Sequence, residues 1–386
     1  MSETLIPYAR QEISEADIAA VVEVLRGDCL TQGPVVPAFE NAVAIQSGAR
    51  YAVAVNSATS ALHVACLALN VGSGDVVWTT PNTFVASANC ARYCGAMVDF
   101  VDIDSDTWCM SAESLAQKLE NARLADAILP KVVIPVHFAG QSCDMEAIAA
   151  LGLKYGFKII EDASHAIGGR YQGRPVGDCS FSDIAVFSFH PAKIITTGEG
   201  GMALTCDSEL AMRMTELRSH GITRDPTRMT SHPDGLWYYQ QLELGFNYRM
   251  TDIQAALGLS QLSQLDMFVA RRNVLAANYD VMLADLPIPR QVVPDDVYSA
   301  RHLYVVRVPP ETHTAVFTQM RAKGIGVNLH YIPVHLQPYY RQFGFSEGQF
   351  PMAESYYREA ISLPMYAAMT DAQQNSVCEI LRESLR

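Results

Sequence analysis

The chain has 386 residues, enough for two domains or for one large α/β domain with an appendage. Hydrophobic residues make up 49% and charged residues 18%, the balance of a folded globular protein rather than a disordered one. The net charge of −13 argues against a non-specific nucleic-acid binder and against docking on an anionic membrane. It does not argue against an anionic ligand, because backbone amides and a few side chains can hold a phosphate.

The sequence shows neither a membrane span nor a secretion signal. No apolar run reaches the length of a transmembrane helix, and residues 1–17 carry acidic side chains and no apolar stretch. The nine cysteines are odd in number, scattered and without a CxxC pair, unlike a secreted disulfide framework. We therefore expect reduced thiols and a cytoplasmic location. Cys90 and Cys94 are four residues apart and fit two small buried side chains better than a metal or redox pair.

Helical and strand patterns alternate along the first part of the chain. Ser14 to Asp17 resembles a capping box, and a helical apolar pattern continues from there to Gly27. Further helices are predicted at 57–69, 84–93, 112–121 and 145–155. Short apolar runs, typical of buried strands, occupy 51–55, 75–79, 96–101, 132–137 and 158–161. This alternation predicts an α/β fold with a mostly parallel sheet, whose strands end at one edge where ligands bind.

The pattern changes after residue 184. Two more strands, 184–188 and 201–205, flank a loop rich in Gly and Thr, and the glycines of 167–173 indicate a hairpin. One long helix is predicted over 251–283. A smaller α+β region would follow, with strand-like runs at 304–308 and 326–330 and helices at 352–360 and 372–385. We therefore predict a large domain of residues 1–245 and a smaller C-terminal domain of residues 246–386.

Two charged side chains stand out on this framework. Asp162 directly follows a predicted buried strand, so its carboxylate would lie at the ligand-binding edge, although a helix N-cap would explain it equally well. Lys193 is one of six lysines, and it alone follows an apolar strand and lies among Ile, Thr and Gly. Burial there would lower the pKa of its amine and make the amine a nucleophile. The alternative is a lysine that extends to the surface.

A third feature lies at residues 56–62, where small hydroxyl residues open a helix directly after strand 51–55. Such a helix N-terminus can hold a phosphate, although ordinary capping alone explains the same residues. Taken together, a reactive lysine, an acid at a strand end and a phosphate cradle meet the requirements of pyridoxal 5′-phosphate. The lysine would bind the aldehyde covalently, and the acid would keep the ring nitrogen protonated so that the ring accepts electrons.

Five motifs in this order resemble the DegT/StrS sugar aminotransferases, which have fold type I. The motifs are NSATSALH (56–63), TTPNTF (79–84), EDASHA (161–166), SFHPAKIITTGEGG (188–201) and GFNYRMTDIQAALGLSQL (245–262). The resemblance runs from Ile6 to near the C-terminus. It implies a large domain with a mostly parallel sheet, a smaller C-terminal α+β domain, and amino transfer with pyridoxal phosphate.

The resemblance also implies roles for individual residues. Lys193 would be the Schiff-base lysine, Asp162 the partner of the ring nitrogen, and His165 a neighbour of the ring. The other cofactor contacts would be Phe84 on the opposite ring face and Ala58, Thr59 and Ser188 at the phosphate. Asn247 would reach the phosphate in the neighbouring subunit, so the enzyme would be a homodimer with shared active sites. The nucleotide-sugar pocket would be lined by Tyr8, Leu30, Thr31, Ala58, Asn328, Leu329, His330 and Tyr331. The residue that binds the donor carboxylate stays open.

The segments IPYARQEIS, LTQGPVVPAFE and NLHYIPVHLQPYY are most similar to members that act in pseudaminic acid synthesis. They imply transfer of the amino group of L-glutamate to the C4 ketone of a UDP-linked 4-keto-6-deoxy-N-acetylhexosamine. The alternatives are an aminotransferase for another nucleotide-linked keto sugar (dTDP or UDP, C3 or C4) and a cofactor-binding regulator that catalyses nothing. The acidic charge and the lack of a visible DNA-binding motif disfavour the regulator.

A metal enzyme is the weakest alternative. It would rest on His330 and His335 in HYIPVH, without an HExxH motif or a paired Cys/His spacing, and we expect no metal.

Overall fold

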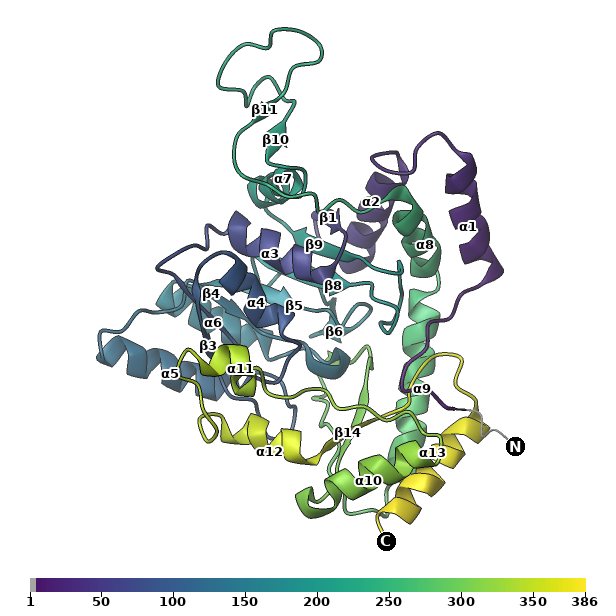
Figure 1. Cartoon of the computed structure of the whole chain (residues 1–386). Coiled ribbons are helices and arrows are strands. Elements are labelled where there is room, and N and C mark those ends of the chain that lie inside the picture. Colours follow the sequence, from purple (N-terminus) through teal and green to yellow (C-terminus); the bar gives the residue numbers. More distant parts are fainter. Residues whose placement is uncertain (1–4) are drawn as a thin grey trace.

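A seven-stranded sheet in the order β1-β9-β8-β5-β4-β2-β3 lies at the centre of the protein (Figure 1). The computed structural model describes residues 5–386. The strands are β1 (Tyr51–Val55), β2 (Val76–Thr79), β3 (Met97–Phe100), β4 (Val132–Ile134), β5 (Lys158–Asp162), β8 (Ile184–Ser188) and β9 (Gly201–Thr205). Only β9 runs opposite to the others, because it pairs antiparallel with both β1 and β8 while the remaining pairs are parallel. The predicted mostly parallel sheet is confirmed, and six strands end at one edge.

Helices pack on this sheet and on one another. Those of the first part are α1 (Glu15–Arg26), α2 (Val35–Ser47), α3 (Ala58–Ala68), α4 (Ala86–Tyr93), α5 (Ala112–Leu124), α6 (Met145–Tyr155) and α7 (Ser208–Leu217). The Ser14–Asp17 capping box is confirmed, since the Ser14 amide and hydroxyl both donate to the Asp17 carboxylate. Helices α3 and α4 pack together, and α3 also packs on β8 and β9. This packing fixes the N-terminus of α3 at the edge where β8 ends.

Two short strand pairs, β10-β11 and β13-β14, and a three-stranded sheet in the order β12-β6-β7 lie outside the central sheet. They comprise β6 (Arg170–Tyr171), β7 (Arg174–Pro175), β10 (Ile222–Thr223), β11 (Gln240–Gln241), β12 (Val297–Tyr298), β13 (Tyr304–Arg307) and β14 (Ala360–Leu363). The predicted hairpin within 167–173 is confirmed as the start of β6-β7, whose turn residues Gln172 and Gly173 both have positive φ. Figure 1 shows β10 and β11 on an arm that projects away from the body of the molecule.

The prediction of one helix over 251–283 is wrong. The structure has two helices, α8 (Asp252–Leu262) and α9 (Leu265–Met282), separated at Ser263 and Gln264. Ser263 ends α8. Its hydroxyl donates to the Ser260 carbonyl, and the backbone amides of Ser263 and Gln264 each donate to the carbonyl three residues earlier instead of four. The 3.6-residue apolar pattern continues across this break and therefore does not reveal it.

The C-terminal part is built on α9, α10 (Pro310–Ala322), α11 (Pro338–Arg341), α12 (Pro351–Glu359), α13 (Asp371–Ser384) and the β13-β14 pair. Segment 326–330, expected as a strand, contributes a single bridge between Asn328 and Ser362. Helix α8 packs against α1 and α2, while α9, α10 and α13 share a second apolar core with β13 and β14. The division at residue 245 stays a prediction.

Within residues 5–386, no helix is long and apolar enough to cross a membrane. The nine cysteines are all free thiols, with Cys90 buried and Cys94 half-buried beside α4. The cytoplasmic location stays a prediction.

Candidate active site

A cavity of about 630 Å³ opens at the sheet edge where the parallel strands end. It is bounded by residues that follow β1, β2, β5 and β8, together with a loop of the C-terminal part. Its walls include twelve of the residues named from the sequence: Tyr8, Ala58, Thr59, Phe84, Asp162, His165, Ser188, Lys193, Asn328, Leu329, His330 and Tyr331. The geometry therefore brings these residues together; their individual roles stay predictions.

The N-terminus of α3 forms one wall of the cavity. Ser57 caps the helix by accepting the Ser60 amide at 3.1 Å, and Ala58 and Thr59 are its first two helical residues. Their amides have no intrahelical partner, since the first N–H groups of a helix point beyond its end. Gly201 of β9 packs closely here, because a Cβ at this position would lie 2.5 Å from the Ala58 nitrogen. This wall suits an anion.

Asp162 ends β5 and is buried at the back of the cavity. Its Oδ2 accepts the Ser87 hydroxyl at 2.6 Å, and its Oδ1 accepts the Ser164 amide at 3.1 Å. The Ser87 hydroxyl in turn lies 2.7 Å from that of Thr83. Both carboxylate oxygens thus accept hydrogen bonds, which fixes the direction in which the acid faces. The N-cap alternative for Asp162 does not apply, because no helix begins there.

Lys193 lies half-buried in the cavity wall, in the loop after β8. In the described part of the chain its amine forms no ion pair or side-chain hydrogen bond with another residue. Burial lowers the pKa of Lys193 to about 8, and the negative charge of Asp162 opposes that shift in part. A lysine with free access to the cavity and a lowered pKa can act as an amine nucleophile near neutral pH.

Three histidines and a tyrosine surround the lysine. Tyr331 Oη lies 3.1 Å from Nε2 of the buried His165, whose ring centroid is 4.4 Å from that of His302. Burial, followed by the Lys193 charge, lowers the pKa of His165 well below its usual value. The same causes lower the pKa of His330 to about 3, and its Nδ1 lies 2.8 Å from the Ser362 hydroxyl. These imidazoles are therefore neutral and leave Lys193 as the titrating base of this group.

The N-terminal segment reaches the cavity along residues 324–326. The Ile6 amide donates to the Gly324 carbonyl and the Ile6 carbonyl accepts the Gly326 amide. This pairing carries Tyr8 to the cavity, where its ring lies 5.6 Å from that of His330. Phe84 also lines the cavity and is 58% exposed, with its ring centroid 6.2 Å from that of Tyr331. The N-terminal segment with Tyr8, the loop with Phe84 and residues 328–331 therefore line the same cavity.

Leu30, Thr31 and Asn247 do not line the cavity of their own chain. All three are exposed. Thr31 bridges Thr251, and Asn247 bridges Ser219. Their predicted roles in binding stay predictions.

Sequence reasoning missed several residues of this site. They are Ser57, Thr83, Ser87, Ser164, His190, Glu199 and His302. Five of them lie inside the motifs named above, so their position was a usable signal: Ser57, Thr83, Ser164, His190 and Glu199. His302 follows α9 by many residues, and nothing in its local sequence distinguishes it.

The HYIPVH histidines do not meet at a metal site. His330 faces the cavity, whereas His335 Nε2 lies 3.0 Å from the buried Glu354 carboxylate. Among residues 5–386 no group of three or more His, Cys, Asp or Glu side chains is placed to hold a metal ion.

The donor set fits pyridoxal 5′-phosphate. One cavity contains an amine that has a lowered pKa and no ion-pair partner among residues 5–386, a carboxylate held by two hydrogen-bond donors, and a helix N-terminus suited to a phosphate. Lys193, Asp162 and the α3 N-terminus would hold its aldehyde, its ring nitrogen and its phosphate, respectively.

Comparison with known proteins agrees with this geometry. Residues 11–382 match the model of the DegT/DnrJ/EryC1/StrS aminotransferase family. The chain belongs to this family. It is 39% identical to the spore coat polysaccharide biosynthesis protein SpsC of Bacillus subtilis, over 99% of this chain and 97% of that protein. It is 36% identical to the UDP-4-amino-4,6-dideoxy-N-acetyl-β-L-altrosamine transaminase of Campylobacter jejuni, over 95% and 93% of the two chains.

Solved structures of family members share the fold. The putative sugar aminotransferase Spr1654 of Streptococcus pneumoniae, in its PMP form, superposes with a TM-score of 0.90 at 30% identity, covering 98% of this chain and 99% of that one. PseC of Helicobacter pylori gives 0.89 at 31% identity, covering 99% of each chain. The predicted fold type, enzyme class and cofactor are therefore confirmed: the protein is a pyridoxal-phosphate-dependent sugar aminotransferase.

The lowered pKa of Lys193 predicts its reactivity in the cofactor-free protein. The neutral, reactive fraction of the amine should be small at pH 7 and should rise to half near pH 8, whereas an ordinary lysine reaches half near 10.4. Labelling with an amine-specific reagent, followed by mass spectrometry of the Lys193 peptide, measures the midpoint. The Lys193→Arg variant supplies the background. A midpoint near 10 would contradict the burial argument.

Proposed function

We propose that this enzyme transfers the amino group of L-glutamate to the C4 ketone of a UDP-linked 4-keto-6-deoxy-N-acetylhexosamine. The product would be UDP-4-amino-4,6-dideoxy-N-acetyl-β-L-altrosamine, for pseudaminic acid synthesis. The observation that carries amino transfer is the uncommitted Lys193 amine beside Asp162 in one cavity. The substrate assignment is supported by the 36% identity to the altrosamine transaminase and by the neighbour involved in pseudaminic acid biosynthesis.

A second candidate is amination of a different nucleotide-linked keto sugar. The relative with the higher identity, 39%, is described as a spore coat polysaccharide biosynthesis protein. Residues 328–331 and Tyr8 would decide between these substrates, because they line the cavity and lie outside the five motifs that would hold the cofactor.

When bound, the cofactor supplies an aldehyde that can carry the amino group and a ring that withdraws electrons from the carbon being deprotonated. Lys193 would hold the cofactor covalently, and its amine, once displaced by the donor, would take the proton from the donor's α-carbon. The same amine would return a proton at the sugar's C4 in the second half-reaction. Its pKa of about 8 suits both steps, because neutral and charged amine are both populated near neutral pH.

Asp162 would keep the ring nitrogen protonated from the end of β5. The donors on its carboxylate, Ser87 and Ser164, hold it toward the cavity. His165 would lie beside the ring, with Phe84 on the other face and Ser188 near the phosphate. The neutral state of His165 leaves proton transfer to Lys193.

The substrate assignment predicts the products of a direct assay. With L-glutamate and the UDP-linked 4-keto sugar, we expect 2-oxoglutarate and UDP-4-amino-4,6-dideoxy-N-acetyl-β-L-altrosamine, whose mass and C4 configuration are determined by mass spectrometry and NMR. The Lys193→Ala variant, which lacks the proton-transferring amine, should lose about 10²–10⁴-fold in rate or more. Turnover of only dTDP-linked or 3-keto sugars would refute the substrate, and full turnover by the variant would refute the role of Lys193.

We also propose that the enzyme works as a homodimer with shared active sites. Leu30, Thr31 and Asn247 lie on the surface of the single chain, outside its cavity. The arm, defined as residues 222–244, adds exposed apolar side chains, including Trp237, which is 75% exposed. An exposed apolar patch of this kind is typical of a surface that meets another protein. A second copy, covering the arm, would bring Asn247 to the neighbouring cofactor phosphate.

Shared sites predict rescue in mixed dimers. A Lys193→Ala chain combined with an Asn247→Ala chain should regain up to about a quarter of wild-type activity on random pairing, because one site in each mixed dimer is intact. A Lys193→Ala chain combined with an Asp162→Asn chain is the matched control and should regain nothing, because both residues belong to one chain's site. Activity assays after joint refolding or co-expression measure this. No rescue in the first pair would contradict shared sites.

A further inference from the structure

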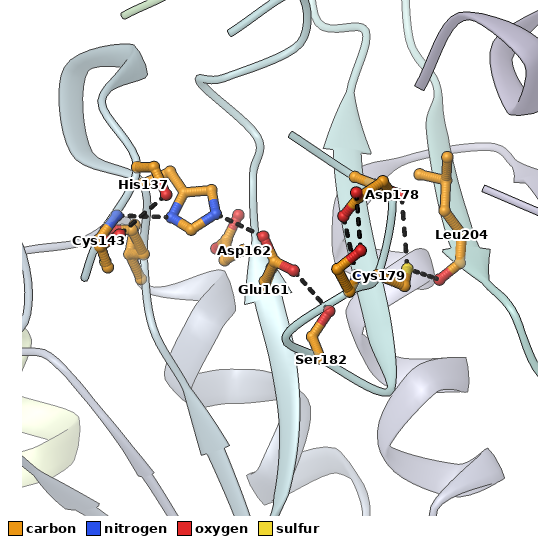
Figure 2. Close-up of polar contacts among 12 residues, drawn as sticks. His137, Cys143, Glu161, Asp162, Asp178, Cys179, Ser182 and Leu204 are labelled. Carbon is orange, nitrogen blue, oxygen red and sulfur yellow. Dashed lines mark hydrogen bonds and ion pairs between the residues drawn. The ribbon is translucent and has the colours of Figure 1, made fainter. Parts of the chain in front are cut away.

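A second buried carboxylate lies directly behind the cofactor site. Glu161 precedes Asp162 on β5, so the two side chains point to opposite faces of the sheet. Figure 2 shows Glu161 between His137 and Ser182. Glu161 Oε2 lies 2.7 Å from His137 Nε2, and Oε1 accepts the Ser182 hydroxyl at 2.5 Å. The His137 side chain is completely buried and Glu161 is 5% exposed.

The hydrogen bonds of this pair fix its protonation. The backbone amide of Cys143 donates to His137 Nδ1 at 3.2 Å, so Nδ1 carries a lone pair and the ring proton of a neutral imidazole sits on Nε2. That proton is donated to Glu161 Oε2, while Ser182 donates to Oε1. Both oxygens accept, which assigns Glu161 as the ionised carboxylate and His137 as its neutral donor.

No cation neutralises this charge inside the protein. Over residues 5–386 the only basic side chain in contact with Glu161 is the neutral His137. Two titratable thiols, Cys143 and Cys179, also face it. Burial raises the pKa of each thiol, and the Glu161 charge adds to that effect. A buried carboxylate without a cationic partner costs folding free energy, and replacement by a neutral side chain would avoid that cost.

We propose that Glu161 is a positioning residue that makes the end of β5 electrostatically negative and so strengthens binding of the protonated cofactor ring at Asp162. The inference rests on the proposed role of Asp162. Both carboxylates are carried by consecutive residues of strand β5. The backbone amide of His137, which follows β4, donates to the Asp162 carbonyl and so ties the Glu161 partner to the same strand end. The charge of Glu161 is therefore held at a fixed distance from the ring nitrogen, on the side away from solvent. At an effective dielectric constant of about 20, a charge about 10 Å away shifts a pKa by about one unit.

The test compares two cofactors in one variant. Pyridoxal 5′-phosphate has a ring nitrogen that can be protonated, whereas its 1-deaza analogue has carbon there and stays neutral. Any effect of Glu161 on the shared phosphate or aldehyde cancels in the ratio of their affinities. In Glu161→Gln, the preference for pyridoxal phosphate over the analogue should fall about tenfold. Equilibrium binding to the cofactor-free protein measures both affinities without any need for turnover.

Position 182 supplies a second variant and its matched control. Ser182→Lys leaves Glu161 in place and sets an ammonium beside it. This variant should reduce the preference for pyridoxal phosphate over the analogue to a similar degree. It keeps the test decisive if Glu161→Gln does not fold. Ser182→Ala removes one hydrogen bond but keeps the charge, and should leave the preference unchanged. Equal loss of affinity for both cofactors would mean that Glu161 is only structural and would overturn the proposal.

The role of Asp162 is tested separately in the same experiment. Asp162→Asn should abolish the preference for pyridoxal phosphate. If it does not, the assignment of Asp162 is wrong, whatever the result at Glu161.

Discussion

The negative charge held at the carboxyl end of β5 is the constraint on which the site depends. Asp162 is buried there with two neutral donors, Ser87 and Ser164, and its charge acts on the partly neutral amine of Lys193. A carboxylate in such surroundings is stabilised by a cationic ligand. A ring nitrogen that carries a proton supplies that charge, and the rest of the cavity follows from where the ring must then lie.

The topology explains why the other groups are within reach. Parallel strands with right-handed connections end at one edge, so the loop after β8 brings Lys193 to the strand end of β5, and the turn after β1 opens α3 toward the same point. The antiparallel β9 brings Gly201 against Ser57 and Ala58, and the absence of a side chain there allows the contact. Sheet register, rather than any local sequence preference, therefore sets the spacing between the anion-binding turn, the acid and the amine.

Much of this arrangement could be predicted from the sequence because the informative residues follow strands. Asp162, Lys193 and Ala58 each stand at a strand end, and the topological rule is sufficient to bring them together. Other features had no such signal. Ser87 holds Asp162 from within a helix, and His302 reaches the cavity from a segment with no distinguishing neighbours.

The break between α8 and α9 was missed for a related reason: a serine hydroxyl bonded to its own backbone ends α8, while the apolar period continues unchanged. Leu30, Thr31 and Asn247 pose a different problem, since they are exposed in the single chain and their predicted roles depend on the proposed second chain.

A crystal structure of the protein reconstituted with pyridoxal 5′-phosphate tests the central claim most directly. The account predicts continuous density from Lys193 Nζ to the cofactor, the ring nitrogen within hydrogen-bonding distance of the Asp162 carboxylate, and the phosphate at the N-terminus of α3. A cofactor joined to another lysine, or a ring nitrogen that faces away from Asp162, would contradict it.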